Sequence, residues 1–137
     1  MLKRPESNLT FDLTATVLVV DDAASSRRLI KKVLDDLGFF TVIACDGEAA
    51  LAKVWEYHPD AIVTDLEMPR MDGEELIEKL RSSENPRIRE LPIIVSSTKI
   101  DGTTLAHLGL LHVNAVVPKP VDVRLLARKT LRLFGAT

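Results

Sequence analysis

Residues 17–38, VLVVDDAASSRRLIKKVLDDLG, contain the change of hydrophobic period that decides the fold. The first four residues are a continuous aliphatic run, which is typical of a strand buried on both faces. Apolar residues then recur at helical spacing between positions 29 and 37. Ser25 or Ser26 is a candidate N-cap, and Gly38 is placed to end the helix. The stretch therefore predicts a buried strand followed by a helix.

The same alternation of strand and helix patterns continues along the chain. Further short apolar segments are predicted to be strands, at residues 40–45, 61–65, 93–97 and 115–118. Segments with helical spacing lie between and after them, at residues 47–57, 73–82, 102–111 and 122–134. Five strands that alternate with five helices require a five-stranded parallel sheet with helices on both faces. The predicted fold class is therefore a doubly wound α/β domain.

Length and composition describe one ordinary globular domain. A chain of 137 residues has room for a single core. We expect an irregular N-terminal leader over residues 1–15 and one domain over residues 16–137. The chain has a formal net charge of −2, so it lacks the basic surplus that is typical of nucleic-acid binding.

Cysteine content and hydropathy indicate the cytoplasm. Cys45 is the single cysteine, so the chain cannot form an internal disulfide or a cysteine-rich zinc site. No apolar run approaches the roughly 20 residues that span a bilayer, and residues 1–6 lack the apolar stretch of a signal peptide. We therefore expect a cytoplasmic protein that enters no membrane.

Polar residues stand at the carboxyl ends of four predicted strands. They are Asp21 and Asp22, Asp65, Ser96 and Ser97, and Lys119. In a doubly wound sheet these ends meet at one edge, where ligands bind. Three carboxylates gathered there repel each other unless a cation neutralises them, and Mg²⁺ prefers such oxygen ligands. An acidic pair after one strand also fits a turn or a helix cap, but the coincidence of four strand ends favours a magnesium site.

Four ordered motifs resemble the receiver domain of bacterial two-component response regulators. They are residues 17–22 (VLVVDD), 63–73 (VTDLEMPRMDG), 91–97 (LPIIVSS) and 117–120 (VPKP). The resemblance covers about residues 16–135, and the order and spacing of the motifs make it highly specific. It implies the flavodoxin-like strand order 2-1-3-4-5. It also implies a phosphoacceptor signalling domain rather than an enzyme.

The resemblance implies phosphoryl-transfer chemistry centred on Asp65. Asp65 would be the nucleophile that accepts a phosphoryl group from a phosphohistidine on a sensor histidine kinase or a phosphotransfer protein. Mg²⁺ would be held by the side chains of Asp22 and Asp65 and by the backbone carbonyl of Glu67. Asp21 would act on the metal through a bound water. The metal would offset the charge on the phosphoryl oxygens during in-line transfer.

The resemblance also assigns roles after the fourth and fifth strands. Lys119 would bind a phosphoryl oxygen as a point charge, and its bond to Pro120 is one that is typically cis in the family. Ser97 would be the switch hydroxyl by its place in the motif, with Ser96 and Thr98 as hydroxyl neighbours. The alternative for Lys119 is that it lies in an ordinary surface loop. The alternative for Ser97 is that its hydroxyl only forms local hydrogen bonds with the loop at the end of the strand.

Two segments depart from the family pattern. The fifth-strand position that usually carries a mobile aromatic ring holds Val116, which cannot swing as a ring does. The signal is therefore expected to leave by another route. Residues 105–111 are unusually apolar, which indicates either packing or a partner or dimer face.

Charged residues near the site have open alternatives. Glu67 and Lys99 are expected either to pair across the mouth of the site or to be solvated. Basic residues of the first helix, from Arg27 to Lys32, are expected to form a solvated face, with steering of an acidic partner as the alternative. The three histidines show no metal-ligand spacing and are assigned no chemistry.

The expected function is a signalling switch whose phosphorylation changes the surface that a downstream protein target senses. Too few residues follow Lys119 for an output domain of about 50 residues, so we expect output through protein contacts by a monomer or weak dimer. The alternative is a receiver-like interaction module that works without phosphorylation. A phosphatase of the haloacid dehalogenase type is discounted, because its nucleophile lies in the first strand and Asp65 follows the third.

Overall fold

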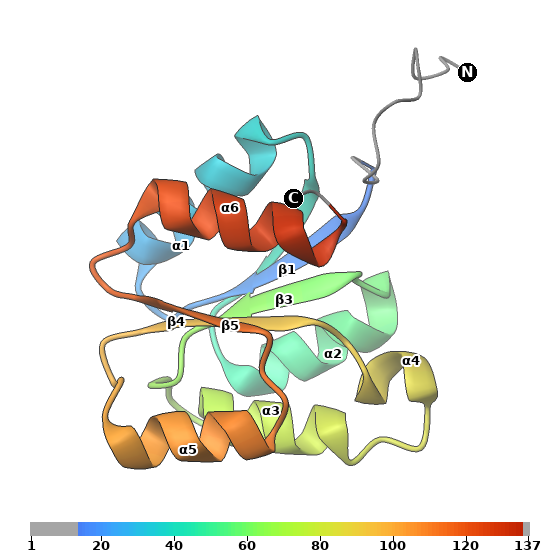
Figure 1. The fold of residues 1–137 in the computed structure, drawn as a ribbon. Helices are drawn as coiled ribbons and strands as arrows, with labels where there is room; N and C mark the ends of the chain where they lie inside the picture. Colours follow the sequence, from blue (N-terminus) through green and yellow to red (C-terminus); the bar gives the residue numbers. More distant parts are fainter. Residues whose placement is uncertain (1–13, 136–137) are drawn as a thin grey trace.

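Runs of aliphatic and β-branched residues form the five strands of one parallel sheet (Figure 1). The structure is a computed structural model that describes residues 14–135. The strands are β1 (Thr16–Val20), β2 (Phe40–Ala44), β3 (Ala61–Thr64), β4 (Ile93–Ser97) and β5 (Ala115–Pro118). Their order is β2-β1-β3-β4-β5, and every neighbouring pair is parallel. The predicted fold class and strand order are therefore confirmed.

Helices cover both faces of the sheet (Figure 1). One face carries α1 (Ala24–Asp36) and α6 (Val123–Leu133). The other face carries α2 (Gly47–Tyr57), α3 (Gly73–Arg81), α4 (Pro86–Arg89) and α5 (Gly102–Leu110). Side chains of a strand alternate between faces, so Leu18 and Val20 join the core on one side while Val17 and Val19 join the core on the other. This double burial explains the unbroken apolar run of β1.

The start of α1 differs from the prediction. Ala23 is the N-cap and makes no side-chain cap bond, so Ser25 and Ser26 lie inside the first turn. The reason is the preceding turn, in which the Asp21 carboxylate accepts the backbone N–H of Ala23 at 2.9 Å and bends the chain directly into the helix. At the other end, Gly38 adopts a φ of 101°, which confirms that it ends the helix.

The short helix α4 was not among the predicted elements. Asn85 is its N-cap and accepts the backbone N–H of Arg87 at 3.0 Å, and Pro86 occupies the first helical position. An Asn-Pro pair is a recognised start signal, but a helix of four residues is too short to show hydrophobic periodicity.

The chain enters the sheet through Ala15. Ala15 is buried, and its carbonyl accepts the N–H of Phe40 at 3.1 Å, one step before β1 begins at Thr16. Residues 1–13 of the expected leader lie outside the described residues. No helix within residues 14–135 has the length and apolar character needed to cross a membrane.

Candidate functional site

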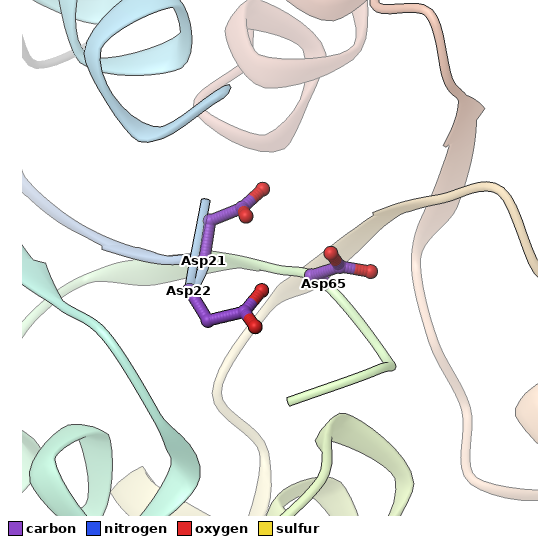
Figure 2. Close-up of side chains that lie close together, drawn as sticks. All are labelled: Asp21, Asp22 and Asp65. Atoms are coloured by element: carbon purple, nitrogen blue, oxygen red, sulfur yellow. The ribbon is translucent and has the colours of Figure 1, made fainter. Parts of the chain in front are cut away.

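Four strand ends bring the predicted residues to one edge of the sheet. Asp21 and Asp22 follow β1, Asp65 follows β3, Ser97 ends β4 and Lys119 follows β5. Figure 2 shows the three carboxyl groups gathered at this edge, and each offers an oxygen that lies within 4.8 Å of the others. Asp21 and Asp65 are buried, whereas Asp22 is exposed. The expected meeting of the strand ends is confirmed.

Lys119 bridges the two buried carboxylates. Its Nζ lies 2.8 Å from Oδ2 of Asp21 and 2.8 Å from Oδ2 of Asp65. Burial alone would lower the pKa of the Lys119 ammonium, but its bonds to the two carboxylates outweigh burial and raise the pKa. Lys119 therefore remains a cation and neutralises part of the acidic cluster. Its bond to Pro120 is cis, as expected.

The other oxygens of the buried carboxylates bind backbone N–H groups. Oδ1 of Asp65 accepts the N–H of Leu66 at 2.6 Å and that of Glu67 at 3.4 Å. Oδ1 of Asp21 accepts the N–H of Ala23, and the Asp21 carbonyl accepts a 2.8 Å bond from the Arg27 guanidinium. Both side chains are thus fixed before any ligand arrives.

The donor set fits a hard divalent cation. Three carboxylates converge, two of them are buried, and Lys119 contacts only two of the three. Asp22 is exposed and adds a carboxylate on the open side of the cluster. Within residues 14–135 no donor bonds the carbonyl of Glu67, so this oxygen also remains available. Oxygen ligands of this kind are those that Mg²⁺ selects.

A close backbone approach sets the position of Asp65. The N–H of Gly73, at the start of α3, bonds the carbonyl of Leu66 at 2.7 Å. A Cβ at position 73 would lie 2.1 Å from the Asp65 carbonyl oxygen and 2.7 Å from Cα of Leu66. Only glycine fits there. Gly73 is needed because the backbone of Asp65 and Leu66 approaches it closely, and not because it has a positive φ.

The loop between Asp65 and α3 is tied to the neighbouring turn. Oδ2 of Asp46 accepts bonds from Nε and Nη2 of Arg70 at 3.0 and 2.6 Å, and the N–H of Gly47 bonds the carbonyl of Met71 at 3.0 Å. Arg70 has a φ of 68°, a left-handed conformation that this anchorage supports. The ties hold the loop that carries the Glu67 carbonyl. The sequence analysis missed the Asp-Gly pair at 46–47, which recurs at 72–73 and 101–102 and marks the start of a helix each time.

The two serines at the end of β4 face opposite sides of the sheet. Ser97 is buried and lies on the same face of the sheet as Val95, two residues before it. Its hydroxyl accepts the N–H of Lys99 at 3.0 Å. Ser96 is equally buried and lies on the opposite face, with Ile94. Its hydroxyl has no hydrogen-bond partner among residues 14–135. The two hydroxyls therefore have different surroundings, on opposite faces of the sheet.

The expected pairing of Glu67 with Lys99 was wrong, whereas the alternative of two solvated side chains agrees with the exposure of both residues. Nζ of Lys99 pairs with Oε1 of Glu74 at 3.5 Å, and Glu67 accepts the hydroxyl of Thr98 at 3.3 Å. Glu74 lies in the first turn of α3, close enough to compete for Lys99. Val116 is half-buried against the core on the α3 and α5 side.

Two further polar centres had no sequence signal. Nδ1 and Nε2 of His107 lie 2.7 and 3.1 Å from carboxylate oxygens of Glu74 and Glu78. The Arg81 guanidinium donates to four backbone carbonyls at 2.8–3.1 Å. Those acceptors are the carbonyls of Arg89, Leu91, Leu111 and His112. Both centres join segments that are distant in the sequence, so no local pattern marks them.

Sequence comparisons give one family. The model of the response regulator receiver domain matches residues 17–130. Chemotaxis protein CheY of Pseudomonas aeruginosa is 34% identical over 119 residues, which are 86% of this chain and 94% of that protein. Chemotaxis protein CheY-3 of Vibrio cholerae is 32% identical over 119 residues, which are 86% of this chain and 90% of that protein.

Comparisons with solved structures agree. A response regulator receiver protein from Pseudomonas putida superposes with a TM-score of 0.78 and 31% identity, over 87% of this chain and 97% of that one. The receiver domain of sensor histidine kinase PA1611 from Pseudomonas aeruginosa superposes with a TM-score of 0.79 and 25% identity, over 90% and 99% of the two chains. That domain has a magnesium ion coordinated in its active site cleft.

Proposed function

The chain belongs to the response regulator receiver domain family, and on this premise we propose that Asp65 accepts a phosphoryl group from a sensor histidine kinase or a phosphotransfer protein. Receiver domains of this CheY-like type are phosphoacceptor signalling domains and are phosphorylated by histidine kinases. The observation that carries the proposal is the contact of buried Asp65 with Lys119 at 2.8 Å beside two further aspartates.

The acidic triad Asp21, Asp22 and Asp65 is typical of the Mg²⁺ site of receiver domains. The side chains of Asp22 and Asp65 and the carbonyl of Glu67 would hold the ion, and Asp21 would reach it through a water. Bound there, Mg²⁺ supplies positive charge that offsets the charge on the phosphoryl oxygens.

The transfer itself uses this chain's own groups. A carboxylate oxygen of Asp65 forms a bond to phosphorus as the phosphorus–nitrogen bond of the donor phosphohistidine breaks, and the imidazole leaves with the bonding pair. Backbone bonds to Oδ1 hold the nucleophile in one orientation. Lys119 then exchanges its bond to Asp65 for one to a phosphoryl oxygen, which keeps its positive charge beside the added negative charge.

The signal leaves through protein contacts. Ser97 turns its hydroxyl from the Lys99 N–H to the phosphoryl group, and the adjoining α5 presents the changed surface to a downstream protein target. Leu105 and Leu110 are exposed on α5, Leu110 to 77% of its surface, so α5 offers apolar side chains to this target or to a second copy in a weak dimer. We further propose that this signalling takes place in the cytoplasm.

A constitutive interaction module is the second candidate. The observation that favours it is Val116, a half-buried side chain without the ring that usually responds to the switch. Such a module would present the α5 face whether or not Asp65 carries a phosphoryl group.

Intact mass after incubation with acetyl phosphate separates the two candidates. The native chain with Mg²⁺ should gain one phosphoryl group, a chelator should prevent the gain, and Asp65→Asn should not be modified. Asp101→Asn makes the same change at an N-cap carboxylate outside the triad and should still be modified, which controls for the substitution itself. If the native chain forms no adduct with acetyl phosphate or with any of a panel of kinases, the phosphoacceptor proposal fails and the constitutive module is the remaining candidate.

A further inference from the structure

Four charged side chains form a continuous path from the switch serine to α5. Lys99 pairs with Glu74 at 3.5 Å, and Glu74 and Glu78 both contact the ring of His107. We call Glu74, Glu78, Lys99 and His107 the α3–α5 latch. Lys99 comes from the loop after β4, the two glutamates come from α3, and His107 comes from α5. The latch therefore joins three elements beside the phosphoacceptor site.

The geometry of the latch favours a protonated histidine. Nδ1 of His107 lies 2.7 Å from Oε2 of Glu74, and Nε2 lies 3.1 Å from Oε2 of Glu78. An ionised carboxylate only accepts hydrogen bonds, and a neutral imidazole has only one N–H to donate. Both contacts are satisfied together only by the imidazolium. The bond to Glu74, followed by the charges of both glutamates, raises the pKa of His107 accordingly.

The proton on His107 determines whether the charges of the latch are balanced. With His107 protonated, two cations face two carboxylates; without the proton, Lys99 is the one cation left in the latch, and the neutral ring can donate to only one of the two glutamates. These are the charged groups that contact His107 or its partners. Its own helix carries no other charged residue, and the N-cap Asp101 bonds Thr104.

The latch also reaches the switch residue. The backbone N–H of Lys99 donates to the Ser97 hydroxyl at 3.0 Å, while the Lys99 ammonium holds Glu74. When Ser97 turns toward a phosphoryl group, Lys99 loses the bond that fixes its backbone. A displaced Lys99 shifts Glu74, and Glu74 is the closer partner of His107.

We propose that protonated His107 is a positioning residue that fastens α5 to α3 in the unphosphorylated chain, and that phosphorylation of Asp65 opens the α3–α5 latch through Ser97 and Lys99. The proposal rests on the proposed phosphoacceptor function and supplies the route that Val116 does not. Linkage is reciprocal, so an event that weakens the latch must also favour loss of its proton. Activation of the site and deprotonation of His107 therefore favour each other.

A titration of the histidine rings by nuclear magnetic resonance tests the proposal. The pKa of His107 is measured in the full chain with Mg²⁺, with and without beryllofluoride as a stable mimic of the phosphoryl group. We expect a lower His107 pKa in the beryllofluoride form. His58 and His112 are exposed and outside the latch, so they serve as internal controls.

A matched variant tests the reciprocal effect. The affinity for beryllofluoride is measured for the native chain and for His107→Gln at a series of pH values. As the pH rises through the range in which His107 loses its proton, the ratio of the native affinity to the variant affinity should increase by about fivefold or more. His112→Gln should follow the native chain. An unchanged His107 pKa in a chain that binds beryllofluoride would overturn the latch alone. Failure to bind beryllofluoride with Mg²⁺, together with no phosphoryl adduct, would overturn the proposed function as well.

Discussion

At the scale of the residue, Lys119 places one ammonium between two buried carboxylates. Asp21 is fully buried and Asp65 nearly so, and each contacts the same ammonium at 2.8 Å. The same ammonium is therefore available for the phosphoryl group without any new charge having to enter the site.

Lys119→Met separates binding of the metal from transfer of the phosphoryl group. Loss of the cation leaves the triad more negative, so Mg²⁺ should bind about tenfold more tightly. The rate of phosphorylation by acetyl phosphate should fall about a hundredfold, because the phosphoryl oxygens lose a charged donor. Calorimetric Mg²⁺ titration and time-resolved intact mass measure the two effects. Lys32→Met, an exposed lysine on α1, should change neither, and weaker Mg²⁺ binding in Lys119→Met would contradict the account.

Ser96 and Ser97 are predicted to respond in opposite ways to replacement by alanine. The Ser96 hydroxyl is buried without a partner in residues 14–135, so Ser96→Ala should stabilise the fold by about 1 kcal/mol and leave phosphorylation unchanged. Ser97→Ala removes the hydroxyl that bonds the Lys99 N–H and should uncouple phosphorylation from the change at α5. Urea unfolding measures the first effect, and amide chemical shifts of α5 measure the second. Reversal of the two phenotypes would make Ser96 the switch.

At the scale of the element, the starts of the helices position the site. Helices α2, α3 and α5 each begin with a glycine after an aspartate N-cap. The glycines are nevertheless not equivalent. Gly73 faces the backbone of Asp65 and Leu66, whereas Gly102 has nothing within 4 Å of an added Cβ.

Gly73→Ala and Gly102→Ala form a matched pair. The alanine at 73 would collide with backbone and should cost about 2 kcal/mol while displacing Asp65 and slowing phosphorylation. The alanine at 102 meets open space, so it should be neutral or slightly stabilising. Urea unfolding and the acetyl phosphate reaction measure both consequences. Equal stability of the two variants would show that the close approach at Gly73 is not required.

The tie between Asp46 and Arg70 predicts a pH dependence. The Ala49 N–H and then the Arg70 guanidinium hold the pKa of Asp46 below its usual range. A depressed carboxyl pKa contributes stability that is fully present above the unfolded value of about 3.9 and is lost as the pH falls through the folded value.

Asp46→Asn should therefore lower the unfolding free energy at pH 7, and the deficit should shrink as the pH falls below about 4. Urea unfolding at a series of pH values provides the measurement. Asp72→Asn removes the charge of an N-cap carboxylate that has no arginine partner in residues 14–135 and should show a smaller deficit at pH 7. A deficit for Asp46→Asn that stayed constant down to pH 2 would exclude the tie as its cause.

The same elements show how far the sequence could predict the fold. The strand β1 and the helix α2 were predictable, since burial on two faces leaves an unbroken apolar run and an apolar stripe leaves a helical period. The first turn of α1 was not, because the Asp21 side chain supplies the turn that a serine cap would have supplied. Helix α4 is a single turn, too short for a period.

At the scale of the whole molecule, the site was predictable and its surroundings were not. Parallel strands point their carboxyl ends to one edge, so order along the chain was enough to gather Asp21, Asp65 and Lys119. The contacts of Arg81 and His107 depend on which helical faces meet across the molecule, and a single sequence does not record that. The path from the site to α5 therefore became visible only in three dimensions.

The central claim is that Asp65 is the phosphoacceptor, and chemical trapping tests it most directly. Borohydride reduces an aspartyl phosphate to homoserine, so peptide mapping of the reduced, phosphorylated chain identifies the modified residue. The account predicts homoserine at position 65 alone, dependent on Mg²⁺ and on prior phosphorylation. Homoserine at position 21 or 22, or at no position in a chain that carries the phosphoryl mass, would contradict it.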